Sequence, residues 1–353
     1  MNKILITICL LTGLALSSNA QDTIKTTPDA PLVIFGSVDT YWKADFSGHS
    51  NIPTSFASDH NSVSIGMLDL GLKKKAGKAS FVGELAFGPR GQYQSTPNGD
   101  GNFLNVNNSF HIQNLYVSYD MTEKFNLSAG YMATFVGYEV VSPVSNFNYS
   151  TSYLFTYGPF QNAGFKATYT FSNKVSLMAG IFNNYWNAYS SYATQGNTTT
   201  SGDVSTFGAQ LMIMPVKGWT AYMNILTGSY SGTEFDLTTA YQITDAFKLG
   251  LNAATFSAPN NGGGFSGLAL YPQIAASKMV SLGVRGEYFK LKNDGGNVTD
   301  ITFTSNIKAG NITLIPEIRF DNKNNVFPAT FVDSDGISTN HAAQFLIAAV
   351  YAF

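Results

Sequence analysis

The stretch TLIPEIRFD, residues 313–321, alternates apolar and charged side chains with a period of two. In an extended strand successive side chains point to opposite faces, so the two kinds of side chain separate. A strand of a soluble sheet with one wet face has this pattern, and so has a strand whose two faces meet two different solvents. The two faces are Leu314, Ile318 and Phe320 against Glu317, Arg319 and Asp321.

The composition favours strands whose two faces meet two different solvents, lipid and water. Charged residues make up 12% of the chain, against about 25% in a typical soluble protein, while hydrophobic residues reach 44% and aromatic residues 14%. Alternating strands with one face in lipid have this composition, because their apolar residues are not gathered into one long run. The formal net charge is −2 and the chain has only three arginines, so no nucleic-acid partner is expected.

Residues 1–20 have the layout of a cleavable signal peptide, with Lys3, an apolar run and small residues before Gln21. The apolar run is too short for a membrane-spanning helix, which needs about 20 residues. Residues 21–31 are expected to be a short periplasmic segment. Cys9 lies within the signal, so the mature chain has no thiol for a disulfide, a nucleophile or a metal ligand.

From residue 32 to residue 353 the period of two recurs in segments long enough to be tilted membrane strands. No helical pattern interrupts them. This predicts an all-β fold, a transmembrane antiparallel up-and-down barrel of about sixteen strands. The predicted strands are 32–46, 62–74, 79–92, 109–121, 125–138, 161–171, 175–186, 204–214, 219–229, 234–243, 247–258, 265–276, 280–292, 299–308, 312–321 and 341–353.

The connections alternate in length. Short turns such as 75–78 and 172–174 join even-numbered strands to odd-numbered ones, and most of the long polar loops lie between them. Bacterial outer-membrane barrels have short periplasmic turns and long outer loops. An even number of strands would place both ends of the barrel on the periplasmic side.

The end of the chain, QFLIAAVYAF, has apolar residues at alternate positions up to a terminal aromatic residue. Tyr351 and Phe353 therefore resemble the assembly signal by which bacterial outer-membrane proteins are recognised.

Several stretches resemble the OmpL-like putative β-barrel porin family. They are QNLYVSY (113–119), SAGYMATFVGYEVVSPVSNFNYSTSYLFTYGPF (128–160), AFGPRG (86–91), GVRGEYF (283–289) and IPEIRFD (315–321). The resemblance implies an outer-membrane pore. Family members often carry basic residues where this chain has Tyr131 and Thr151, so strong anion selectivity is not implied here.

Nothing in the sequence predicts an enzyme, a cofactor or a metal site. The histidines stand far apart and none has a metal-ligand spacing. The acidic loop stretches 321–325 and 333–336 lack the ligand order of a calcium loop, and we interpret them as solvated loops, with a weak calcium site as the alternative. The histidines are His49, His60, His111 and His341.

The three arginines lie opposite the apolar residues of their predicted strands, and Arg285 and Arg319 each have a carboxylate two residues away. An arginine facing lipid would cost about 2–4 kcal/mol at the bilayer midplane. We therefore expect these charges to be hydrated in a pore, where they either line the path or hold the wall as a paired ladder. The predicted pore-lining residues are Asp39, Lys43, Glu84, Arg90, Arg285, Glu287, Glu317, Arg319 and Asp321.

The predicted outer loop 139–160 is rich in aromatic residues and poor in charge. Exposed apolar clusters usually mark a packing surface. We therefore expect this loop to fold into the barrel and narrow it. The residues expected at the constriction are Asn146, Tyr149, Ser150 and Tyr153.

These patterns predict an outer-membrane porin, a water-filled channel for passive diffusion of small hydrophilic solutes, because sixteen strands leave an open lumen. The alternative is a barrel whose long outer loops bind a partner in adhesion. Expected partners are outer-membrane lipid, the barrel-assembly machinery and small solutes. A homotrimer is an open alternative to a monomer.

Overall fold

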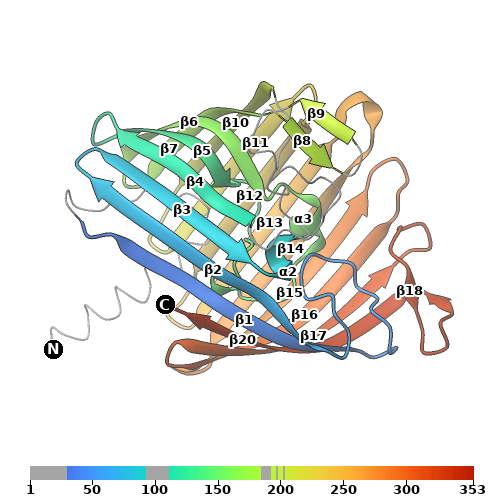
Figure 1. Ribbon diagram of the computed structural model, residues 1–353. Helices are drawn as coiled ribbons and strands as arrows, with labels where there is room; N and C mark the ends of the chain where they lie inside the picture. Colours follow the sequence, from blue (N-terminus) through green and yellow to red (C-terminus); the bar gives the residue numbers. More distant parts are fainter. Residues whose placement is uncertain (1–29, 93–110, 184–191, 196–197, 202) are drawn as a thin grey trace.

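The described residues form a closed antiparallel barrel of sixteen strands, in which β1 completes the ring by pairing with β20 (Figure 1). A computed structural model describes residues 30–92, 111–183, 192–195, 198–201 and 203–353. The fold prediction is confirmed. The barrel strands are β1 (Val33–Asp45), β2 (Val63–Ala76), β3 (Ala79–Phe87), β4 (His111–Asp120), β5 (Phe125–Ala133), β6 (Gln161–Ser172), β7 (Val175–Asn183), β10 (Val204–Ile213), β11 (Trp219–Gly228), β12 (Gly232–Gln242), β13 (Phe247–Ser257), β14 (Gly264–Ala275), β15 (Val280–Leu291), β16 (Asn297–Ala309), β17 (Ile312–Lys323) and β20 (His341–Ala352).

Short elements occur in the connections between barrel strands. They are the two-stranded pairs β8 (Tyr192–Gln195) with β9 (Thr198–Ser201) and β18 (Phe331–Val332) with β19 (Ser338–Thr339), the helices α2 (Pro89–Gln92) and α3 (Tyr153–Tyr157), and the 3-10 turns η1 (Pro143–Ser145) and η2 (Pro259–Asn261). No helix in the described part of the chain is long and apolar enough to cross a membrane.

The two faces of β17 separate as its sequence predicts. Leu314 and Phe320 are 40% and 42% exposed on the outside, whereas Glu317, Arg319 and Asp321 are buried inside. The outward positions of β20 follow the same rule, with Ile347, Tyr351 and Phe353 all exposed. An apolar outer face and a polar inner face are what a barrel in lipid requires.

Pro316 lies on the outer face of β17, within the closed sheet. The registered pairs between β16 and β17 stop between Glu317 and Leu314, on either side of the proline. On the other side β17 stays in register with β20 through the pair Pro316–Ile347. Proline has no backbone N–H to donate, so the interruption falls on the β16 side alone.

Two predicted strands are too long. The strand predicted at 79–92 ends at Phe87, where Gly88 has a φ of 105° and Pro89 begins α2. The strand predicted at 125–138 ends at Ala133, and the chain turns into the lumen there. At the end of β3, glycine with a positive φ leaves the extended conformation and proline suits the first position of a helix, so Gly88 and Pro89 end that strand.

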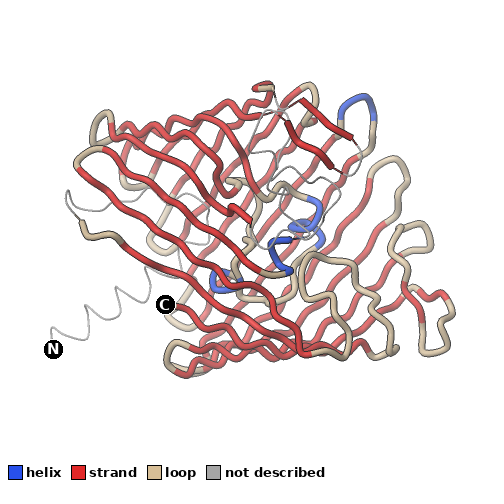
Figure 2. Tube along the Cα trace, in the orientation of Figure 1, coloured by secondary structure: helices blue, strands red, loops and turns tan. Residues whose placement is uncertain are grey.

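Both ends of the barrel wall lie at one rim. Gly36 of β1 and Phe353 after β20 exchange backbone hydrogen bonds of 3.1 and 3.0 Å. The short turns, such as those after Ala76 and Ser172, connect strands at this same rim (Figure 2). In outer-membrane barrels this is the periplasmic side. The predicted signal peptide 1–20 lies outside the described residues, as does the predicted segment 21–31 up to residue 29.

Candidate functional site

The connection between β5 and β6 lies inside the barrel, and we call its residues 139–160 the inner segment. Figures 1 and 2 show its helix α3 within the ring of strands. Tyr149 and Tyr153 are 1% and 0% exposed. The segment returns to the wall where Thr134 N donates to Phe160 O at 3.0 Å. The long, charge-poor inner segment is therefore buried against the inner wall of the barrel.

Wall glycines make room for the side chains of the inner segment. A Cβ added at Gly283 of β15 would lie 2.3 Å from a ring carbon of Phe147. A Cβ at Gly267 of β14 would lie 2.8 Å from a methyl carbon of Leu154. Glycine in a strand often marks such a close approach. The wall thus has recesses shaped for the segment.

Two buried arginines bind the main chain of the inner segment. Arg285 Nη1 donates to Ser150 O at 2.6 Å, and Arg319 Nη1 donates to Thr151 O at 2.8 Å. Asp300 of β16 lies between the two guanidinium groups, 2.7 Å from Arg285 and 3.5 Å from Arg319. Both arginines are 0% exposed. Buried charges need such compensation, and here the wall and the loop supply it together.

Two wall carboxylates accept hydrogen bonds from backbone amides of the same stretch. Glu317 accepts from Tyr149 N at 2.9 Å and from Ser150 N at 3.1 Å. Glu287 accepts from Tyr153 N at 2.8 Å and from the next amide at 2.7 Å. Charge-assisted bonds of this kind are stronger than neutral ones. Together with Arg285 and Arg319, these two glutamates bind the main chain of residues 149–154 through four charged side chains.

Tyrosine hydroxyls of the inner segment bind further wall carboxylates. Tyr153 OH donates to Asp321 at 2.6 Å, and Tyr149 OH donates to Asp39. Burial raises the pKa of both hydroxyl groups above the usual value for tyrosine. Both groups therefore stay protonated and donate their hydrogen bonds throughout the physiological pH range.

Glu139 is the only charged residue of the inner segment. Its carboxylate lies 3.0 Å from Arg285 Nη1 and accepts from the amide and the hydroxyl of Ser152, both at 2.7 Å. Ser152 also caps α3, because its hydroxyl accepts from Phe155 N at 3.0 Å. Glu139 thus joins the start of the segment to its helix and to the wall.

Arg90 lies on α2, and its prediction as a strand residue is wrong. Its guanidinium carbon lies 4.4 Å from the ring centre of Phe56 and 4.6 Å from that of Tyr149. Its Nε is 3.8 Å from Asp39. Stacking between two rings stabilises a buried guanidinium group. Arg90 therefore joins the loop after β1 to the inner segment.

Two predicted inward residues on β1 and β3 have nearby partners. Lys43 is buried with its amino group 3.1 Å from Asp45. Glu84 accepts a hydrogen bond from Asn114 of β4.

Among the described residues no three His, Cys, Asp or Glu side chains are grouped as metal ligands. The amide of Asp45 donates to His60 at 2.9 Å, so this histidine has a structural contact.

The expectation that the strand arginines stand hydrated in an open lumen is wrong. Arg285 and Arg319 are fully covered, because the inner segment lies directly over them. The sequence pattern gives the face on which a strand residue lies, but it does not say what covers that face.

Two members of this network, Asp300 and Glu139, were missing from the predicted set. Asp300 lies within the predicted strand 299–308 and shares the alternation of Thr302, so its inward position can be read from the sequence. Glu139 had a signal of its own, as the one charge in an apolar loop.

Asn146 differs from the other three predicted constriction residues. Its side-chain amide donates to Val140 O at 2.7 Å and accepts from Val140 N at 2.9 Å. It therefore closes a hairpin, residues 140–146, within the inner segment. Tyr149, Ser150 and Tyr153 lie in the buried network instead.

The inner segment has a cavity of about 660 Å³ on each side. The acidic cavity faces β1–β4 and has Asp69 and Glu84 in its wall. The basic cavity faces β13–β17 and β20 and has Lys248 and Lys308 in its wall. Asn311, in the last short turn, borders both cavities, so both reach the periplasmic rim.

Solved outer-membrane channels share this fold. The outer membrane channel DcaP of Acinetobacter baumannii superposes with a TM-score of 0.60 at 11% identity, over 91% of this chain and 97% of that one. The anion-selective porin from Comamonas acidovorans gives 0.59 at 12% identity, over 92% and 99%. OmpT of Vibrio cholerae gives 0.55 at 13% identity, over 93% and 99%. At such low identity the likeness shows a common fold.

A search of curated proteins finds no match to this sequence. A model of one protein family matches residues 31–353, which is the whole barrel. The family is described as putative beta-barrel porin-2, OmpL-like. The resemblance noted in the sequence is thereby confirmed. A porin of this fold lies in the bacterial outer membrane. The family and the fold point to a channel rather than an enzyme. The chain belongs to the OmpL-like family of β-barrel porins.

Proposed function

We propose that this porin is a passive diffusion channel for small hydrophilic solutes, in which the inner segment is a fixed filter at the narrowest part. The observation that carries this proposal is the attachment of the segment's main chain to buried charges of the wall. Arg285 and Glu287 of β15, with Glu317 and Arg319 of β17, hold residues 149–154 from two strands.

A fixed filter follows from the cost of moving the segment. If it swung out, both arginines would lose their carbonyl partners. A hydrogen bond to a charged group is typically worth about 1.5–3 kcal/mol. Thermal motion rarely supplies enough free energy to break several such contacts at once. Solutes would therefore pass beside the segment, through the acidic and basic cavities, and the constriction would comprise the hairpin with Asn146.

The further partners are part of the same proposal. Outer-membrane lipid would cover the apolar outer face, and the assembly machinery would bind the last strand at Tyr351 and Phe353. We propose a homotrimer as the assembled state, as an arrangement that leaves one channel in each chain. No enzymatic activity is proposed, and no cofactor.

Liposome swelling tests the proposed function. Vesicles that contain the folded protein should swell in small sugars, more slowly in larger ones, and not in polysaccharides. Vesicles with heat-unfolded protein are the control. Folded protein that admits no sugar would exclude the proposal and favour the alternative, in which outer loops bind a partner in adhesion.

A further inference from the structure

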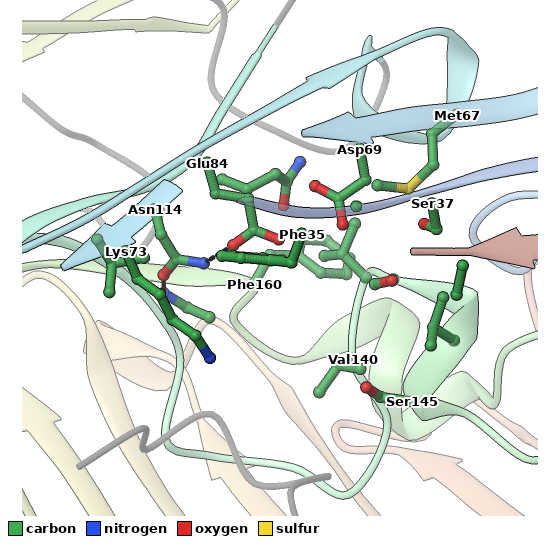
Figure 3. A pocket seen from close by; sticks show the side chains of 18 of the residues that line it. Phe35, Ser37, Met67, Asp69, Lys73, Glu84, Asn114, Val140, Ser145 and Phe160 are labelled. Carbon is green, nitrogen blue, oxygen red and sulfur yellow. Dashed lines mark hydrogen bonds between the residues drawn. The ribbon is translucent and has the colours of Figure 1, made fainter. Parts of the chain in front are cut away.

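The outer surface of the barrel has a groove of about 620 Å³ in the wall formed by β13 to β17 and β20, which we call the wall groove. The outward-facing side chains described there are all uncharged. The acidic cavity inside the barrel differs, since Figure 3 shows Asp69 and Glu84 in its wall. Ser305 and Pro316 are small residues of the groove, and the larger side chains around them are Leu282, Phe303 and Phe345.

A second hollow, of about 470 Å³, lies at the outer rim between the same wall and the pair β18–β19, and we call it the rim cleft. Figure 1 shows β18 at the side of the barrel away from the C-terminus. The wall contributes the apolar residues Ile301, Phe320 and Ala343 and, one outward-facing row nearer the rim, the polar residues Thr299, Asn322 and His341. The overhanging pair contributes Val332, Asp333 and Thr339.

The two hollows adjoin on one face of the wall. Phe303, Ile318 and Phe345 are paired across three strands in the wall groove, and the next outward-facing row toward the rim is the apolar row of the rim cleft. A polar cleft therefore lies directly above an apolar groove.

The depth of this combined surface matches one leaflet of a bilayer. The strand from Pro316 to Asn322 is about 20 Å long at roughly 3.4 Å per residue. A tilt of about 35–45° turns this length into a depth of about 15 Å. The hydrocarbon core of a bilayer is about 30 Å thick, so the surface spans its outer half.

The polar groups of the rim cleft suit an uncharged headgroup with hydroxyl groups. Asp333 is held in place, because its Oδ1 accepts from Asp335 N at 3.0 Å and from Ile337 N at 2.9 Å. A carboxylate accepts hydrogen bonds from hydroxyl groups, and the amide of Asn322 can both donate and accept. No lysine or arginine is among the described residues that line the cleft. A phosphate would therefore face a carboxylate without the cation that usually binds it.

We propose that the rim cleft and the wall groove together bind one outer-leaflet lipid whose headgroup is a sugar. Its acyl chain lies in the wall groove over Ser305 and Pro316, and its hydroxyl groups bind Asn322, His341 and Asp333. The inference rests on the proposed contact of the outer face with lipid, and it adds a particular class of lipid at a particular place.

Native mass spectrometry of the folded protein, released from detergent micelles, measures bound lipid directly. The probes are glucosyl diacylglycerol and phosphatidylglycerol with the same acyl chains. The wild type should retain one glucosyl diacylglycerol at lipid concentrations about tenfold lower than it needs for phosphatidylglycerol, because the hydrogen bonds of the cleft distinguish the two headgroups. Equal retention, or stronger retention of the phospholipid, would overturn the proposal.

The variant Ser305→Phe locates the acyl chain. The new ring fills the wall groove, and the barrel still folds because an apolar side chain suits the lipid face. Retention of glucosyl diacylglycerol should weaken by about tenfold or more. The matched control is Ser266→Phe on β14, at an outward-facing position that lines neither hollow. The control should bind like the wild type. A Ser305→Phe protein that keeps the lipid, or that loses self-association instead, would overturn the proposal.

The double variant Asn322→Ala/His341→Ala locates the headgroup. It should retain the two lipids equally, and an unchanged preference for the sugar would overturn the proposal. Vesicles with Ser305→Phe should swell in sugars like the wild type, because the wall groove lies outside the lumen. A wild type that binds the lipid but admits no sugar would contradict the proposed function alone.

Discussion

At the scale of single residues, Asp300 explains how two guanidinium groups lie side by side within the wall. It contacts Arg285 at 2.7 Å and Arg319 at 3.5 Å, and all three side chains are fully buried. Both arginines then direct an Nη1 atom toward a loop carbonyl. The charges of β15, β16 and β17 thus serve first to hold the inner segment.

Replacing Arg319 by glutamine should destabilise the protein. The buried carboxylate of Asp321 would lose its cation and that of Asp300 one of its two, and we expect the free energy of unfolding to fall by about 3–5 kcal/mol. Urea unfolding in lipid vesicles measures this change. Lys217→Gln, in an exposed turn, should leave the value within about 0.5 kcal/mol. Equal stability of the two variants would mean that the buried network contributes nothing.

A larger residue at Gly283 should displace the inner segment. The new side chain of Gly283→Val would overlap Phe147, whose ring carbon lies 2.3 Å from the position of the added Cβ. We expect a stability loss of about 1–3 kcal/mol from this overpacking, with an altered conductance. Gly286→Val is the matched control on the same strand, because a Cβ there meets nothing within 4 Å. A Gly283 variant that behaves like this control would show that the segment does not need its recess.

At the scale of elements, the sequence predicts the strands far better than the contacts made inside the barrel. A period of two is local, so the sixteen segments match the observed strands, with clear errors only where β3 and β5 end. The network around the inner segment depends on long-range contacts, such as Tyr149 with Glu317, that no local period encodes. The aromatic content of residues 139–160 indicated burial, but its partners needed the closed barrel.

The buried position of the inner segment makes Tyr149 inaccessible. The one cysteine, Cys9, lies in the predicted signal peptide, so a Tyr149→Cys variant cleaved as predicted carries a single thiol. We expect a bulky impermeant maleimide added from outside to leave this thiol unlabelled. The same reagent should label Ser334→Cys, which lies in an exposed outer turn. Equal labelling at both positions would show that the segment stands outward.

The last strand carries the expected assembly signal. Phe353 is 50% exposed, and its removal also takes away the two backbone hydrogen bonds that it exchanges with Gly36. We expect the truncated protein to accumulate unfolded in the periplasm, because the assembly machinery would lose its contact. Heat-modifiable migration on gels detects the folded barrel. Phe171→Ala, which removes another exposed aromatic residue near the same rim, should fold normally. Normal migration of the truncated chain would disprove the signal.

At the scale of the whole molecule, the inner segment borders two cavities whose walls carry opposite charge. Asp69 and Glu84 border one cavity, and Lys248 and Lys308 border the other. Opposite charges on two parallel routes partly cancel in the total current. We therefore expect weak ion selectivity for the channel as a whole, with cations and anions favouring different sides of the segment.

The hairpin 140–146 borders both cavities, and Arg90 Nη1 donates to its Val141 O at 3.3 Å. Val140 and Asn146 are hydrogen-bonded to each other, so residues 141–145 can be replaced by two glycines without moving the ends. An equal shortening of the exposed turn 333–337, which Asp333 N closes by donating to Ile337 O at 2.9 Å, is the control.

Single-channel conductance of these two variants beside the wild type tests the filter most directly. The wild type and the control with the shortened outer turn should give the same conductance steps. The variant with the shortened hairpin should give larger steps, because the two cavities merge at the narrowest part of the lumen. Equal steps in all three proteins, with folding verified on gels, would contradict the claim that the inner segment sets the size of the channel.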